Sequence, residues 1–477
     1  MDLSQLPDIT NLLITLRKMM SKGWITHDVQ LYTTIWSNIP GLRRVTHATL
    51  NENSTNFFTA FGAEAEALRP RLHPSLVPPI DNPDQSSVPV SIFAWGFPTP
   101  DGFIEEFEAD LQDQPVDSLV RLGHVGLAGE GSGGGVIYHQ SFHRVGLFMH
   151  IDSPDFGFPV EDHPGIWNPL ETVLSHWIDL IRIGKVVASP HEEPALFDFE
   201  KIGPWEWCPY SKAQVTKCVG AWDRLCRTIE ARISQLPNPP SLVGPIPGID
   251  TDNPEPLVTS TVLDAASLPG PSFARSFLTR ARRPRFQYIA PGLILPPADS
   301  SEFVAAQPFT LLPRSQYTAP PVCLFPAEGG DQYPIQLTRT TTPFLSSDYY
   351  SSSTDTCTQS CISAGLHTME VARNGLDTAE DGFRLLLPFT LNGVGAGKSD
   401  ERLAERGSFS DLFQHEFKPF GGDYYRPQRL ERLLDCWRKL LEEGVWPVGS
   451  KGVEGTIDTF KDAESDCWED YYIPPTW

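Results

Sequence analysis

Several features that would quickly assign a function are missing from this 477-residue sequence. It has eight cysteines but no CxxC pair, and only Cys357 and Cys361 lie close together, as CxxxC. Structural zinc usually takes two closely spaced ligand pairs, so neither a zinc module nor a disulfide framework is predicted. No run reaches the roughly 18 apolar residues that a membrane-spanning helix needs. The N-terminal segment lacks the basic region and cleavage site of a signal peptide, so we expect a soluble, cytoplasmic protein.

Positive charge is scarce: 37 lysine and arginine residues stand against 60 aspartate and glutamate residues, which gives a net charge of −23. A strongly acidic surface is repelled by phosphate backbones and by anionic lipid. The sequence therefore predicts neither a nucleic-acid partner nor a membrane partner. No cofactor is predicted either.

Two motifs with a known chemistry are incomplete. A nucleophile elbow needs G-x-S-x-G at a strand-to-helix turn, but Glu130 stands where the glycine before Ser132 belongs. The segment LLLPFTLNGVGAGKSDERL, residues 385–403, is spelled like a phosphate-binding loop. The Walker A pattern requires glycine at the position of Asn392. The segment therefore predicts a strand-to-helix connection and no nucleotide site.

Three short runs with strand character cover residues 118–128, 135–140 and 144–151, and short turns join them. His139 and His143 flank the second of these turns. These runs predict a small antiparallel sheet.

A helix is predicted in NPLETVLSHWIDLIRIGKV, which follows this sheet. Asn168 is a suitable N-cap, and Pro169 fits the first helical position. Gly184 gives the signal for the C-terminal end.

Two further segments, residues 211–234 and 428–443, keep the 3.6-residue period of an amphipathic helix. Ser211 is the N-cap of the first. Its apolar face comprises Val215, Cys218, Val219, Trp222, Leu225, Cys226, Ile229 and Ile233. The apolar face of the second comprises Leu430, Leu433, Leu434, Trp437, Leu440 and Leu441. We expect both faces to be core.

Together these elements predict an α+β fold in which a small, mostly antiparallel sheet packs against helices. Residues 1–235 form the predicted N-terminal domain. Residues 237–271 hold nine prolines and no periodic pattern, which predicts a proline-rich linker over residues 236–272. Residues 273–477 form the predicted second, mixed domain, which ends in an acidic tail.

A local excess of positive charge interrupts the acidic chain. No acid lies between Asp264 and Asp299, and five arginines gather there. Arginine guanidinium groups bind phosphate or carboxylate through paired hydrogen bonds. The run could therefore bind an anionic or diphosphate-bearing ligand, or it could pair with the acidic tail. The five candidates are Arg275, Arg280, Arg282, Arg283 and Arg285.

The sequence offers one set of candidate metal ligands. His150 and Asp152 form an HxD pattern at the end of a predicted strand, which is typical of a two-histidine, one-carboxylate iron site. His191 is the candidate distal ligand. The alternative is that these side chains belong to ordinary strand ends and turns.

Three segments resemble an uncharacterised family of fungal cytosolic proteins: GIWNPLETVLSHWIDLIRIGKV, GPWEWCPYSKAQVTKCVGAWDRL and FARSFLTRARRPRFQYIAPGL. This resemblance covers most of the chain and implies no activity. A second resemblance covers residues 129–181, in GEGSGGGVIYH, RVGLFMHID and PLETVLSHWIDLI. The order of these segments is similar to the SUKH superfamily, whose members bind proteins and carry no catalytic residues.

Two functions from different classes remain. The first is a non-catalytic protein-interaction or scaffold protein, indicated by the SUKH-like stretch and the incomplete catalytic motifs. The second is an enzyme of fungal secondary metabolism, of cyclase or transferase type, acting on an apolar or diphosphate-bearing substrate. It rests on the arginine run, the aromatic content, His150 and Asp152.

Overall fold

The computed structural model shows an α+β protein, as predicted. It describes residues 57–74, 76, 100–104, 118–123, 135–148, 167–169, 182–188, 201–202, 205–238, 255–307, 309–310, 319–329, 335–336, 361–374, 377–389, 391, 429–465 and 467–473. Within these ranges, no helix combines the length and the apolar composition needed to cross a membrane.

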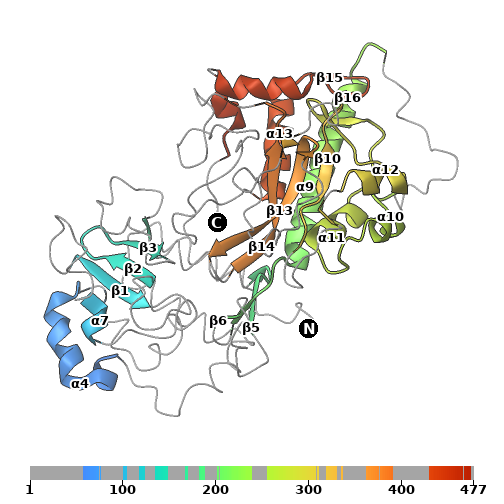
Figure 1. Cartoon of the computed structure of the whole chain (residues 1–477). Coiled ribbons are helices and arrows are strands. Elements are labelled where there is room, and N and C mark those ends of the chain that lie inside the picture. Colours follow the sequence, from blue (N-terminus) through green and yellow to red (C-terminus); the bar gives the residue numbers. More distant parts are fainter. Residues whose placement is uncertain are drawn as a thin grey trace, which may run out of the picture.

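The first sheet is antiparallel and confirms the three predicted strands. Its order is β1 (Leu119–Gly123), β2 (Gly135–His139), β3 (Arg144–Phe148) and β4 (Asn168–Pro169). In the described part of the chain before this sheet lie α4 (Phe57–Leu68), η2 (Arg69–Arg71) and α7 (Pro100–Ile104). Figure 1 shows α7 beside β1, and α4 packs against α7. The buried apolar residues of this group include Phe58, Leu68, Ile104, Val120, Ile137 and Val145.

The predicted start of the helix after this sheet is wrong. Asn168 and Pro169 form β4, where Asn168 lies opposite Val145 and Pro169 lies opposite Arg144. Proline lacks an amide proton, so it suits an edge strand such as β4. Gly184 does adopt the left-handed conformation, with φ 73°, that favours glycine.

A small sheet with the order β5 (Val186–Ala188), β7 (Trp205–Trp207) and β6 (Lys201–Ile202) precedes the long helix α9 (Lys212–Ser234). The predicted N-cap is confirmed. The Ser211 hydroxyl accepts a hydrogen bond from the Gln214 amide at 3.2 Å, and the Gln214 side chain accepts one from the Ser211 amide at 2.7 Å. This reciprocal pair satisfies amides that have no partner within the helix.

The second predicted amphipathic helix is α13 (Leu430–Glu442), and its whole apolar stripe is buried as expected. It packs along α9, which buries all of its predicted face except Val219, a half-buried residue. Polar contacts reinforce this pairing at the surface. Arg224 forms an ion pair with Asp435 at 2.9 Å, and Arg232 donates to the Glu442 carbonyl at 3.0 Å.

The pairing of α9 with α13 joins segments that the predicted boundaries separate. One hydrophobic core runs from Val215 to Ile473 and includes α10 (Ser260–Ala265), α11 (Phe273–Arg280) and α12 (Ser300–Ala305). Figure 1 shows these three short helices together beside α9. Residues 257–268, expected to be linker, instead bury Leu257, Val258, Leu263, Ala266 and Leu268. Their apolar side chains are spaced irregularly, so the segment shows no period although it is core.

Two sheets complete this core. One has the order β10 (Cys323–Pro326), β13 (Gly365–Asn374) and β14 (Asp377–Leu386). The other has the order β15 (Val448–Gly449), β16 (Gly452–Val453), β8 (Tyr288–Ala290) and β9 (Leu293–Ile294). A further pair consists of β11 (Ile335–Gln336) and β12 (Cys361–Ile362).

The predicted acidic tail is folded into the same body. It forms η7 (Ile457–Glu464) and leads to η8 (Trp468–Tyr471), and both bury apolar side chains. Backbones approach closely here. A Cβ atom on Gly452, which has φ 119°, would lie 2.2 Å from the Tyr288 carbonyl oxygen. Only glycine allows this contact.

Candidate functional site

The arginine run lies on and just after α11, and its side chains reach neighbouring elements. Arg275 forms an ion pair with Asp264 at 2.5 Å and donates to the Leu268 carbonyl at 3.3 Å. Arg280 donates to the Thr216 hydroxyl of α9 at 2.8 Å. These contacts fasten α10 and α9 to α11.

Arg282 is the most strongly paired member of the run. Its guanidinium group donates two hydrogen bonds to the Glu230 carboxylate, at 2.7 and 2.9 Å, and lies 3.4 Å from Asp223. Its carbonyl accepts from the Trp222 indole at 2.8 Å. The predicted pairing with carboxylates therefore occurs, but the acids belong to α9 and not to the acidic tail.

Arg283 donates to two backbone carbonyls, those of Leu257 at 2.6 Å and Pro296 at 2.9 Å. It thereby connects two loops of the core. Arg285 is exposed. Four of the five anion-binding candidates thus bind groups of the protein itself.

The other predicted sites fall outside the described residues. This holds for His150, Asp152 and His191, and for the loop from Asn392 onward. Where side chains are described, no group of three or more histidine, cysteine, aspartate or glutamate residues could hold a metal ion. The metal and enzyme hypotheses therefore stay predictions.

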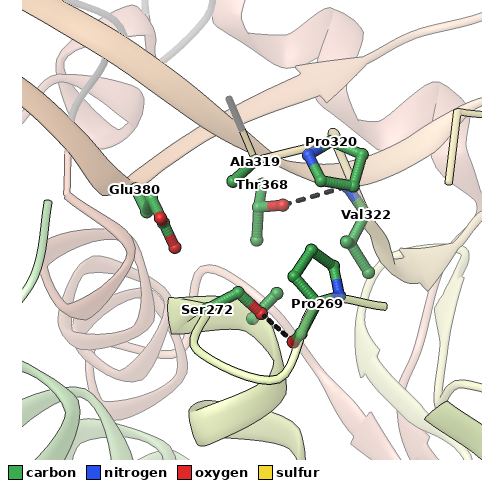
Figure 2. A pocket seen from close by; sticks show the side chains of 8 residues that line it. Pro269, Ser272, Ala319, Pro320, Val322, Thr368 and Glu380 are labelled. Atoms are coloured by element: carbon green, nitrogen blue, oxygen red, sulfur yellow. Dashed lines mark hydrogen bonds between the residues drawn. The ribbon is translucent and has the colours of Figure 1, made fainter. Parts of the chain in front are cut away.

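A small pocket lies where α11 begins, against β13 and β14 (Figure 2). Its volume is about 10 Å³, which is room for about one water molecule. Figure 2 shows the hydroxyl groups of Ser272 and Thr368 bonded to backbone atoms. The Ser272 hydroxyl donates to the Pro269 carbonyl at 3.1 Å, and the Thr368 hydroxyl accepts from the Val322 amide at 2.9 Å. The pocket is too small for an organic substrate.

Two adjacent acids on β14 hold the beginnings of two helices. A register shift in the β13–β14 ladder, of the kind a β-bulge produces, lies beside them. Glu380 accepts from the Phe273 amide of α11 at 2.7 Å. Asp381 accepts from the Gln214 side chain of α9 at 2.9 Å and lies 3.6 Å from Arg429. Carboxylates are favourable at helix N-termini, so these contacts stabilise the fold.

The turn between β2 and β3 differs from the arginine run, the small pocket and the acids of β14, because an apolar side chain is exposed to solvent there. We call residues 140–143 the hairpin tip. Phe142 is 45% exposed there, and the only other exposed large hydrophobic residue in the described part of the chain is Val445, at 40%. The Phe142 ring leans on His139, with 4.7 Å between ring centroids, and His139 in turn contacts Trp167.

Side-chain hydrogen bonds hold the hairpin tip in place. His143 adopts a left-handed conformation with φ 53°, which is uncommon for a residue other than glycine. The hydroxyl of Tyr138 shares a hydrogen bond of 2.8 Å with Nδ1 of His143. Because Tyr138 is buried in β2, this bond fixes the ring of His143 relative to the sheet.

A second set of contacts ties the hairpin tip to the segment after η2. The buried Gln140 side chain accepts from the His73 amide at 2.5 Å and donates to the Arg71 carbonyl at 3.0 Å. The rings of His73 and His143 meet edge to face, with centroids 4.5 Å apart and planes at 78°. Burial, and secondly the charge of His143, lowers the pKa of His73.

The sequence indicated part of this site. It placed His139 and His143 at a turn, and the structure confirms the turn. It gave no reason to select Phe142, His73 or Tyr138, because the contact of His73 with His143 spans 70 positions. An aromatic residue within a polar turn was the one available signal.

No protein-family model matches this chain, and no match is found among curated proteins or among solved structures. The resemblances to a fungal family and to the SUKH superfamily therefore stay predictions.

Proposed function

We propose that this protein is a non-catalytic binding protein that contacts a protein partner through the hairpin tip. The observation that carries the proposal is the exposure of Phe142 on a turn that is fixed from two sides. Aromatic residues are enriched among the side chains that supply most of the energy at protein interfaces. The exposed part of the Phe142 ring contributes no burial energy to the fold itself.

The rigidity of the hairpin tip supports this function. Binding costs free energy when it orders mobile groups, so a surface that is ordered beforehand binds more tightly. The Tyr138–His143 hydrogen bond and the two hydrogen bonds of Gln140 order the tip in the free protein. Phe142 is therefore held in one place without a partner.

The charge beside Phe142 indicates the chemistry of the partner. Arg144 is exposed and begins β3 directly after the tip, and Arg71 lies on the segment that Gln140 binds. Two arginines thus lie on the elements around Phe142, in a chain whose net charge is −23. Complementary charge orients partners and selects among them. We therefore propose a partner that presents acidic residues around an apolar pocket for Phe142. The resemblance of residues 129–181 to a protein-binding superfamily agrees with this proposal.

Selection of peptides from a random phage-displayed library on the full chain tests the proposal. The expected result is enrichment of acidic peptides that contain an apolar residue. Phe142→Ala should weaken their binding by about tenfold or more, as is usual for a dominant interface residue. Arg144→Glu should also weaken it.

The matched control is Val445→Ala, which removes the other exposed apolar side chain of similar accessibility. It should leave the affinity unchanged. The proposal is overturned if no peptide is enriched, if the enriched peptides are not acidic, or if their binding is indifferent to Phe142→Ala.

A further inference from the structure

Two basic side chains lie together where α11 ends against the first turns of α9. Arg280 is the last residue of α11, is exposed, and donates to the Thr216 hydroxyl at 2.8 Å. That hydroxyl in turn donates to the Lys212 carbonyl at 2.8 Å. Lys212 and Thr216 are both exposed and are i, i+4 neighbours, so their side chains share one face of α9. We call Arg280 and Lys212 the cation pair.

The acids of the neighbouring helices are bound to other members of the arginine run. Glu230 of α9 binds Arg282 at 2.7 Å, and Asp223 of the same helix lies 3.4 Å from Arg282. Asp264 of α10 pairs with Arg275. Within the described residues, neither member of the cation pair has an acidic partner. The charge of the cation pair therefore faces solvent without compensation, although acids are in excess in this chain of net charge −23.

The donors of the cation pair fit an oxyanion that carries more than one charge. A guanidinium group has five N–H donors, and the bond to Thr216 uses one donor of Arg280. The ammonium group of Lys212 stands on a flexible four-carbon stem, so it can reach the same anion. A carboxylate brings a single charge, whereas a phosphate group carries about −1.5 to −2 at pH 7. Two cations thus match the charge of a phosphate group, whose oxygens also suit the arginine fork.

We propose that the cation pair binds the phosphate group of a small molecule. Arg280 supplies paired hydrogen bonds, and Lys212 supplies the second charge. The half-buried hydroxyls of Tyr210 and Ser276 lie 3.5 Å apart, close before Lys212 and one turn before Arg280, and offer polar contacts to the rest of such a ligand. The site is separate from the hairpin tip, so the proposal does not depend on the proposed function.

Titration of methyl phosphate with the full chain, followed by phosphorus NMR at a constant ionic strength of about 0.1 M, tests the proposal. Binding should be saturable. Arg280→Gln and Lys212→Gln should each weaken it by about tenfold, because each removes charge-assisted hydrogen bonds to the anion. Acetate, which has one charge, should displace methyl phosphate only at about tenfold higher concentration than inorganic phosphate does.

Inorganic phosphate distinguishes the two sources of the same group. If methyl phosphate binds more tightly, the ligand is a phosphate ester. If inorganic phosphate binds more tightly, the ligand is the free ion. Either result supports the site.

Two control variants separate the site from general charge and from helix packing. Arg227→Gln removes an exposed arginine about three turns beyond Thr216 on α9 and changes the net charge equally, so it should leave the affinity unchanged. Thr216→Val removes the hydroxyl that Arg280 binds but keeps both cations, so it should retain most of the affinity.

Three results overturn the proposal. The first is the absence of saturable binding. The second is an equal loss in Arg227→Gln and Arg280→Gln, which would show an unspecific effect of net charge. The third is an equal loss in Thr216→Val and Arg280→Gln, which would show that Arg280 only fastens the two helices.

Discussion

The buried histidine of β13 gives the most direct test of the electrostatics of this fold. His367 is 1% exposed, and its Nδ1 lies 3.3 Å from the Gly365 carbonyl. Burial lowers its pKa to about 4, although the hydrogen bond to Gly365 acts in the opposite direction. Arg384 lies opposite it on β14 and is also buried. We expect His367 to be neutral in the folded protein down to about pH 4.

The effect on stability follows from the difference between the folded and unfolded states. The unfolded chain protonates this imidazole near pH 6.5, whereas the folded chain does so only near pH 4. Folding therefore releases a proton between these values, and the free energy of unfolding falls as the pH falls. A difference of about 2.5 units corresponds to about 3 kcal/mol, of which about 2 kcal/mol is lost by pH 5. Above pH 6.5 the His367 imidazole is neutral in both states, so it does not change the free energy of unfolding with pH.

Urea denaturation at pH 7.5, 6, 5 and 4.5 measures this loss. Tryptophan fluorescence is a suitable signal, because Trp222, Trp437 and Trp446 lie in the same core as β13. His367→Gln removes the titrating group, so between pH 7.5 and 5 the variant should lose about 2 kcal/mol less free energy of unfolding than the original protein. This pH-dependent loss is compared, and not the stability at one pH, because the substitution also changes the stability at neutral pH. Parallel curves for the two proteins would refute the reasoning.

Three further substitutions test the packing, each by the free energy of unfolding in urea. Gly452→Ala brings a Cβ atom to 2.2 Å from the Tyr288 carbonyl oxygen and should lower the free energy of unfolding by more than about 2 kcal/mol. The control Gly444→Ala places its Cβ atom where no other atom lies within 4 Å, so it should cost only about 1 kcal/mol of backbone strain. Equal losses would contradict the close approach at Gly452. Ser211→Ala removes the cap of α9 and should cost about 1 kcal/mol, so an unchanged stability would show that the cap is dispensable. Trp437→Ala empties a fully buried site and should cost about 3–5 kcal/mol, so a loss below that of the Ser211 variant would contradict its core position.

Local patterns in the sequence were sufficient where a segment's own neighbours decide its structure. Both long amphipathic helices appear, and their predicted faces are buried except at Val219; Ser211 caps the first of them. The hairpin around His139 and His143 also appears. In each case, the periodicity or the turn residues act over fewer than about ten positions, so the signal lies within the segment itself.

Segments whose partners are distant in sequence were predicted less well. Asn168 and Pro169 read as a helix start, but pairing with β3 makes them an edge strand. Residues 257–268 read as a linker, but α11 and its neighbours bury their apolar side chains. A high proline content indicates that a segment does not form a regular helix or a central strand. It does not indicate whether other elements bury the apolar side chains of that segment.

The candidate site shows the same division. A run of five arginines indicated a region of charge, yet the partners of four of them come from α9, α10 and loop carbonyls, which no local pattern reveals. The polar turn at residues 140–143 was visible, but the exposure of Phe142 and its support by His73 were not.

The sequence by itself determined the α+β class, the two amphipathic helices and the position of the hairpin, because periodicity, capping and turn chemistry are properties of neighbouring residues. Only the tertiary structure decided that α9 belongs to the C-terminal core, that four of the five arginines bind groups within the fold, and that an aromatic side chain stands exposed on a turn held by two histidines. These facts depend on contacts between residues far apart in the chain. Such contacts form only in the folded protein, so a local pattern in the sequence does not contain them.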